Sequence, residues 1–280
     1  PSAIYDYESG GAAAIYMRGA FDPDAFDSSL DKVSIRETGV NYESFVDALI
    51  AGAPESGLEN PTFDILQPAE LPFDWTIGYD CTICSTNDDP AATPIAASAT
   101  LTLAAKTDVL FTNVVFTGGT PVLKVGADAV ARLAGTVGLD RIDLEGDGEL
   151  VMAGELDPTY AYRVTPAEGH TGLGEVFGRA TVDLETAKKC AGLFVNWVET
   201  ELVGEAVDDG NGGVALRWTI GDVPDSAAVA RLNQSGTSIK FADLKVLAKY
   251  VTNDAEIVVT TNCTLEGFLA VRGKNVTIRS

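Results

Sequence analysis

The fold of this chain is decided by three short segments, Leu101-Thr102-Leu103, Leu123-Lys124-Val125 and Ile142-Asp143-Leu144. Each places two aliphatic side chains on one face of an extended strand and a polar side chain between them on the other face. Successive segments are 22 and 19 residues apart, and the stretches between them are rich in glycine. A unit of about 20 residues that is built from very short strands and turns predicts a β-solenoid.

The C-terminus shows the same alternation. The pair Ile257/Val259 and the pair Val276/Ile278 stand 19 residues apart, so we expect two further stacked strands there. The segment Val109–Thr117 carries apolar residues at consecutive positions, which predicts a strand that is covered on both faces.

An asparagine at the corner of a coil can join a ladder of stacked amides. Asn113 is the candidate for such a corner, with Asn262 and Asn275 as possible counterparts near the other end of the chain.

One helix and one hairpin depart from a plain solenoid. Asn41–Ser44 can cap a helix whose apolar stripe is Phe45, Val46, Leu49 and Ile50 and which ends at Gly52; we expect it to close one end of the solenoid. The turn residues Asp208–Gly213 predict a hairpin that leaves one coil as an excursion.

We therefore predict an all-β chain that forms a right-handed parallel β-helix, or β-solenoid, with loop excursions and a short capping helix. A β-sandwich is the alternative, because the hairpin also suits that fold. The chain is interpreted as a single domain over residues 1–280, in which residues 1–94 form a cap and irregular elaboration. Residues 95–280 form the β-helix core. Six prolines between residues 53 and 94 favour loops there, and Phe63–Leu66 and Phe73–Ile77 are possible short strands between them.

The charge balance limits the partners. The chain has 41 acidic and 19 basic residues, a formal net charge of −22, so phosphate repulsion argues against nucleic acid as a partner. No apolar run approaches the ~20 residues of a bilayer span, so we expect no membrane insertion of this chain. The acidic surface suits solubility outside the cell or at the cell surface, and calcium is the cofactor that so many carboxylates could use.

Four cysteines and one histidine are the candidates for reactive chemistry. Cys81 and Cys84 have the C-x-x-C spacing, which is compatible with a structural pair of thiols, a small disulfide loop, redox chemistry or half a zinc site. Cys190 and Cys263 have no other cysteine nearby in the sequence and are interpreted as small buried hydrophobic residues. His170 lies in a glycine-rich loop, which favours a surface or loop-stabilising role over a catalytic one.

The run Asp143–Glu149 has acids at alternate positions, like the start of a calcium loop. It fails that pattern at its third and twelfth positions, which are Glu145 and Gly154, so it is interpreted as a solvated strand with an acidic turn. Aromatic residues that could stack on sugar rings, or serve as core and rim, are Trp75, Tyr79, Tyr160, Tyr162, Trp197 and Trp218.

Four segments resemble the coils of right-handed parallel β-helix proteins of the pectin-lyase-like and bacterial adhesin type. They are Asp108–Gly119, Pro121–Gly135, Gly138–Gly154 and Ala255–Arg279, under half of the chain. The resemblance implies a scaffold that adhesins, passenger domains and carbohydrate-active enzymes share. None of the family's active-site motifs matches, so no catalytic, cofactor-binding or metal-binding residue is assigned.

Two functions follow as hypotheses. The first is a secreted or cell-surface, non-enzymatic protein of bacterial type that presents a β surface to a glycan or a protein. The second is a carbohydrate-active enzyme on the same scaffold, a polysaccharide lyase or a glycoside hydrolase. Flat exposed faces favour binding, whereas a groove with clustered acids of perturbed pKa, especially round His170 or a cation, favours an enzyme.

Overall fold

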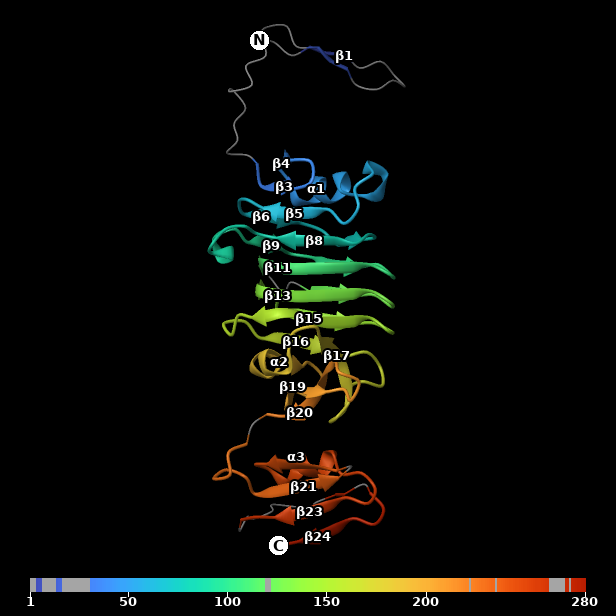
Figure 1. The fold of residues 1–280 in the computed structure, drawn as a ribbon, viewed down its shortest axis with the longest axis vertical. Helices are drawn as coiled ribbons and strands as arrows, with labels where there is room; N and C mark the ends of the chain where they lie inside the picture. The colour runs from blue at the N-terminus through green and yellow to red at the C-terminus, as the bar shows by residue number, and fades with distance from the viewer. Residues whose placement is uncertain are drawn as a thin grey trace.

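The computed structural model describes residues 4–6, 14–16, 31–118, 122–221, 223–234, 236–261, 270–271 and 273–280. From residue 31 on, short strands stack coil upon coil along one long axis (Figure 1). The stack is a β-solenoid of about nine turns. The predicted all-β fold is confirmed, and the β-sandwich is wrong because the strands of neighbouring coils pair in parallel.

Each coil contributes strands to up to three faces of the solenoid. Face A consists of β5 (Thr62–Ile65), β8 (Cys81–Cys84), β11 (Asp108–Thr117), β13 (Val130–Gly138), β15 (Glu149–Leu156) and β17 (Val176–Ala180). Face B consists of β7 (Trp75–Ile77), β10 (Thr100–Leu103), β12 (Val122–Val125), β14 (Arg141–Leu144), β16 (Tyr162–Thr165) and β18 (Phe194–Asn196). Face C consists of β6 (Ala69–Leu71), β9 (Ile95–Ala97) and the C-terminal half of β11.

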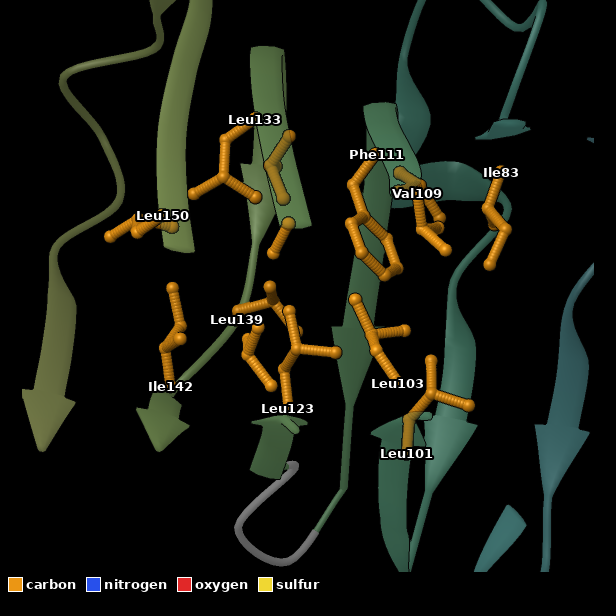
Figure 2. Packing of buried hydrophobic residues seen from close by; sticks show 14 of the residues in the cluster. Ile83, Leu101, Leu103, Val109, Phe111, Leu123, Leu133, Leu139, Ile142 and Leu150 are labelled. Carbon is orange, nitrogen blue, oxygen red and sulfur yellow. The ribbon is translucent and has the colours of Figure 1, made fainter. Parts of the chain in front are cut away.

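The register on face B is the one that the sequence predicts. Leu101 lies beside Leu123, Leu123 beside Ile142, and Ile142 beside Val164 of the next coil. All four side chains are at most 3% exposed. Figure 2 shows Leu101, Leu123 and Ile142 of this row facing the inward side chains of face A, such as Phe111, across the core. Burying one such aliphatic side chain stabilises the fold by about 1.5–3 kcal/mol.

The stack begins earlier than the cadence of the sequence suggests. β5 and β7, which confirm the short strands expected at Phe63–Leu66 and Phe73–Ile77, pair in parallel with β8 and β10 respectively. The prolines do not prevent this, because they lie between very short strands: Pro68 precedes β6, Pro72 follows it and Pro94 precedes β9.

The strand β11 turns a corner at Asn113. Its φ of +50° is a left-handed conformation, which ends the alternation of face A and starts that of face C. The apolar run Val109–Thr117 therefore includes a bend. Alternate residues are buried before Asn113, whereas Val114, Val115 and Phe116 are all buried, so the predicted cover on both faces is confirmed for the second half of the strand alone. The Oδ1 atom of Asn113 accepts a hydrogen bond from the Thr136 N–H of the next coil at 3.1 Å. A Cβ on the neighbouring Gly135 would lie 2.3 Å from that oxygen, so this corner requires glycine.

The predicted asparagine ladder is absent from the described residues. Asn113 is stacked on Gly135, whereas Asn275 belongs to a different sheet, where its side chain donates to Asp254 at 2.9 Å. Asn262 lies outside the described residues.

An antiparallel hairpin and a helix close the N-terminal end of the stack. β3 (Val33–Ile35) pairs antiparallel with both β4 (Val40–Tyr42) and β5, and α1 (Phe45–Ala51) follows. The side chain of Ser44 caps the helix and Gly52 ends it, as predicted. Ile50 is 56% exposed, so it does not belong to the buried stripe.

The hairpin β19 (Leu202–Asp208) and β20 (Val214–Ile220) is confirmed, but it is not an excursion from a coil. β20 pairs antiparallel with β17, and β19 with β18, so the hairpin covers the last strand of face A and of face B. A parallel edge has unpaired N–H and C=O groups, and this hairpin satisfies them. Helix α2 (Leu184–Ala191) lies between β17 and β18, and the Leu156 N–H contacts the buried sulfur of Cys190 at 3.3 Å.

A second, smaller sheet follows with its own hydrophobic cluster round Leu232, Phe241 and Ile257. It consists of β21 (Ala230–Gln234), β22 (Thr237–Phe241), β23 (Glu256–Val259) and β24 (Thr277–Arg279), with α3 (Leu244–Lys249) after β22. The parallel pair β23–β24 places Ile257 beside Ile278, which is 21 residues away. The predicted offset of 19 residues is therefore wrong by two. A further antiparallel pair, β1 (Ile4–Asp6) and β2 (Ala14–Tyr16), lies before residue 31.

The stacked row gives a direct test of what stabilises the fold. Leu123→Ala removes a fully buried side chain between two coils and is expected to lower the free energy of unfolding by about 2–5 kcal/mol. Its neighbour Lys124 points outward to Glu145 at 2.7 Å, so Lys124→Ala is expected to cost at most about 1 kcal/mol. Urea unfolding followed by circular dichroism measures both. Equal losses would contradict the inward register.

Candidate functional site

The C-x-x-C segment forms β8, and the strand separates its two thiols. Cys81 points into the core, whereas Cys84 lies on the outer side, where the Arg36 guanidinium contacts its sulfur at 3.4 Å. Three steps along a strand separate the two Cα atoms by about 10 Å, beyond the reach of a disulfide. Cys81, Cys84 and Cys190 are free, and Cys263 lies outside the described residues.

Burial raises the pKa of both thiols of this segment. Burial together with the Asp80 carboxylate raises the pKa of Cys81 to about 12. Burial and Asp64 raise the pKa of Cys84 to about 11, although Arg36 opposes this shift. A redox or metal-binding cysteine needs a stabilised thiolate, so the geometry supports the structural pair of thiols.

His170 stabilises its own loop. Its Nδ1 atom lies 2.9 Å from the carbonyl oxygen of Val176, and its own carbonyl oxygen accepts a hydrogen bond from the Trp218 indole N–H at 3.0 Å. The Trp218 ring is fully buried and stacks on Phe177 with 3.8 Å between centroids. The loop-stabilising role that the sequence suggests therefore fits the contacts of His170.

The acidic run at 143–149 is spread over three ion pairs. Asp143 pairs with Arg141 at 2.7 Å, Glu145 with Lys124 at 2.7 Å, and Glu149 with Arg179 of the next coil. Within the described part of the chain, no group of three or more acidic, histidine or cysteine side chains is arranged to hold a metal ion. Glu145 and Glu149 thereby link neighbouring coils, whereas Asp143 pairs within its own strand.

A groove of about 560 Å³ lies beside this run and brings distant carboxylates together. Asp147, Glu149 and Asp209 line it together with His170 and Arg179. This is the gathering of acids round His170 that the sequence analysis associates with an enzyme. Hydrogen bonds from the backbone N–H groups of residues 211 and 213 lower the pKa of Asp209, and Glu149 is paired with Arg179. Asp209 is thereby favoured in its ionised form, which suits it poorly to act as the general acid of glycoside cleavage.

Most of the aromatic residues that the sequence singles out belong to the core. Tyr162 and Trp218 are fully buried, and Trp75, Tyr79 and Tyr160 are partly buried against the core. Trp197 differs from them, because its side chain is 40% exposed.

Trp197 lies at the end of face B over two stacked arginines. Arg141 of β14 and Arg163 of β16 are in register on adjacent coils, and their guanidinium carbons lie 5.1 and 5.4 Å from the centre of the indole ring. Ion pairs hold the guanidinium groups in place, Arg141 with Asp143 and Arg163 with Asp140. Each cation–π contact at such an exposed site contributes about 0.5–1 kcal/mol, so the indole is held in one orientation.

A buried asparagine fixes the chain at Trp197. Asn196 is fully buried, and its Oδ1 atom accepts hydrogen bonds from the N–H groups of Val198 and Glu199, both at 2.9 Å. Its Nδ2 atom donates to the carbonyl oxygen of Thr171 at 3.1 Å. Val198, 59% exposed, extends the apolar surface beside the indole. The sequence analysis missed this role of Asn196, since an asparagine after a short apolar run gives no signal of its own.

The rest of face B presents a polar row towards Trp197. Its members are in register from coil to coil: Thr76, Thr102, Lys124 and Asp143; the next residue in this register, Thr165, has a buried hydroxyl oxygen. From β7 to β18 the face spans five strand spacings, about 24 Å. Phe73, 52% exposed, contacts the Trp75 ring at the β7 end. We call this surface, from Phe73 to Val198, the Trp197 face.

Comparisons with protein-family models, with curated proteins and with solved structures find no match to this chain. In the described residues, no helix is both long and apolar enough to cross a bilayer. The chemistry of the surface therefore carries the functional argument.

The thiols give a test of the site geometry. In the native protein at pH 8, Cys84 is expected to resist iodoacetamide, because roughly 0.1% of a thiol with a pKa near 11 is ionised. Cys81 is expected to react more slowly still, and both react in urea. Mass spectrometry of peptides measures the labelling. Fast native labelling, or a disulfide between the two residues, would contradict the separation of the thiols on β8.

Proposed function

We propose that this protein is a non-enzymatic, secreted or cell-surface β-helix protein, adhesin-like and of bacterial type, which binds a glycan through the Trp197 face. The observation that carries the proposal is the exposed Trp197 indole, held over Arg141 and Arg163 on a regular sheet surface. A preoriented aromatic ring offers a large apolar contact at small entropic cost.

The polar row supports a carbohydrate rather than an apolar ligand. Hydroxyl and charged side chains repeat along face B at the spacing of one coil, about 4.8 Å. Hydroxyl groups of a polysaccharide chain can form hydrogen bonds with several of these residues at once. Lys124 and the two arginines are already paired with carboxylates, so the face carries little unbalanced charge and favours a neutral glycan.

The pectin-lyase-like and adhesin type of β-helix is part of the same proposal. It is supported by the parallel solenoid and by the resemblance of its coils, and the overall charge of −22 suits a soluble surface outside the cell. A protein partner is the other ligand class that such a face could bind.

The groove beside His170 carries the alternative function, a carbohydrate-active enzyme. Its supporting observation is that Asp209, from the turn of the β19–β20 hairpin, lines one groove with Asp147 and Glu149, which are distant from it in sequence. Polysaccharide cleavage needs two positioned acids, or a base with calcium. The ion pair of Glu149 and the lowered pKa of Asp209 weigh against it.

The binding proposal is tested by substitution of the exposed indole. Trp197→Ala is expected to weaken binding to a glycan selected from an array by at least ~10-fold, as for an aromatic residue at the centre of an interface. Ile50→Ala, at an apolar residue of similar exposure on α1, is the matched control and should bind like the wild type. Isothermal titration measures both affinities. Unchanged binding by Trp197→Ala would refute this site.

The enzyme alternative is tested with the same protein and a panel of polysaccharides, with and without calcium. We expect no new reducing ends and no unsaturated products. If products form, and Glu149→Gln and Asp209→Asn abolish them while Trp197→Ala does not, the groove is an active site and the non-enzymatic proposal is wrong.

A further inference from the structure

The small C-terminal sheet repeats the topology of the N-terminal end of the solenoid. In the first unit, β3 pairs antiparallel with β4 and with β5, and β5 pairs in parallel with β8. In the second unit, β21 pairs antiparallel with β22 and with β23, and β23 pairs in parallel with β24. The registers agree as well, because Val33 lies opposite Tyr42 and Ile65 just as Ala230 lies opposite Phe241 and Val259.

The helices of the two units also follow the second strand at the same distance along the chain. In each unit one residue separates the end of the second strand from the N-cap, which is Ser44 before α1 and Asp243 before α3. Both side chains accept a backbone hydrogen bond of the first turn. The turn of each hairpin contains a glycine with positive φ, Gly39 and Gly236.

A left-handed corner precedes the parallel strands in both units. Residues with a φ of about +50 to +66° lie two positions before β5, β11 and β13: Asn60, Lys106 and Asp128. Asp254 and Asn275 take the same conformation, with φ of +59° and +58°, two positions before β23 and β24. Non-glycine residues seldom adopt this conformation, so its recurrence at one position is a structural signature of a coil of face A.

An arginine clamp between coils recurs too. In the first solenoid Arg132 of β13 donates through Nε and Nη2 to both carboxylate oxygens of Asp108, the first residue of β11. Arg279 of β24 donates through the same two nitrogens to both oxygens of Glu256, the first residue of β23. In both cases the arginine lies two residues beyond the register partner of the acid.

The two units differ in what stacks on the final strand of each, which is β8 in the first unit and β24 in the second. Ile83 of β8 is fully buried, because β11 stacks on it with Phe111 in register. Ile278 stands at the same place in β24, since its partner Ile257 corresponds to Phe63, the partner of Ile83. Ile278 is 57% exposed, and among the described strands β24 pairs with β23 alone.

We propose that residues 230–280 are the N-terminal cap and first coil of a second β-solenoid, and that the free edge of β24 accepts the next coil of the same polypeptide in parallel register. The pairing between coils that builds the first solenoid is thus repeated by β21, β23 and β24. Every parallel coil in the described chain is joined by the chain itself to the coil that it covers.

A second copy of the chain fits this edge less well. The described N-terminal end of its solenoid is closed by the hairpin β3–β4, and the C-terminal end of that solenoid by the hairpin β19–β20. Face A of such a copy is thus closed at both ends, and among its described strands the parallel edges that remain are β24 itself and the three-residue strands β6 and β7, which belong to other faces. A continuing coil meets β24 in the parallel direction without any rearrangement.

The test extends the full chain by its own coils. Since Ile278 corresponds to Ile83, a copy of residues 86–221 is added after Ser280, so that β24 takes the place of β8. Hydrogen exchange at Thr277–Arg279 is expected to slow by at least ~10-fold relative to the unextended chain, because the β24 backbone gains partners. Exchange in β13 of the first solenoid is the internal standard and should not change.

Further variants distinguish a wrong proposal from an extension that does not fold. In the extended chain, Ile278→Asp places a charge in the new core and should abolish the protection, whereas the outward Thr277→Ala should retain it. In a second chimera, residues 276–280 are replaced by residues 81–85 before the same extension, which shows whether the added coils fold at this junction. If only that chimera is protected, or neither is, β24 is not a template and the proposal is wrong. Concentration-dependent dimers of the unextended chain with a protected β24 would identify a second copy as the occupant and also overturn it.

Discussion

Every coil of this protein depends on aliphatic side chains that stack in parallel register along the axis. Leu101, Leu123, Ile142 and Val164 form one such row, and each lies beside its register partners in the neighbouring coils. The core is therefore continuous along the axis but thin across it, and no coil can bury its apolar surface alone. Both ends of a stack would expose apolar side chains and unpaired strand edges. The hairpins and α1 at the two ends of the solenoid follow from this constraint.

The same constraint leaves the outer faces free for other chemistry. Outward side chains contribute little to the core, so they form ion pairs between coils, as Arg132 does with Asp108. Because the strands are in register, any outward residue repeats at one coil spacing, and a regular polar surface results. The indole of Trp197 gains a fixed orientation on that surface from two arginines that adjacent coils bring together. Binding on a face and catalysis in the groove by His170 are thus separate proposals for separate regions.

The sequence predicts the fold better in some parts of the chain than in others, for physical reasons. The face B strands β10, β12 and β14 alternate cleanly, because one side faces the core and the other faces water. In Val109–Thr117 the alternation breaks at Asn113, where a left-handed residue turns the strand through a corner, and the pattern of apolar residues does not reveal this bend. Between residues 53 and 94 the strands have three or four residues, so the apolar pattern indicates β5 and β7 but not how they pair.

The sequence by itself determined the inward rows, the helix that Ser44 caps and the hairpin at Asp208–Gly213, since each is set by residues close together in the chain. Only the tertiary structure decided which distant residues meet. Arg36 reaches Cys84 across 48 residues, and Trp197 meets Arg141 across three coil strands of face B. Such contacts depend on the length of every intervening coil, which varies with its loops. The likeness between the N-terminal cap and residues 230–280 lies in pairing, corners and clamps, and these are properties of the folded backbone.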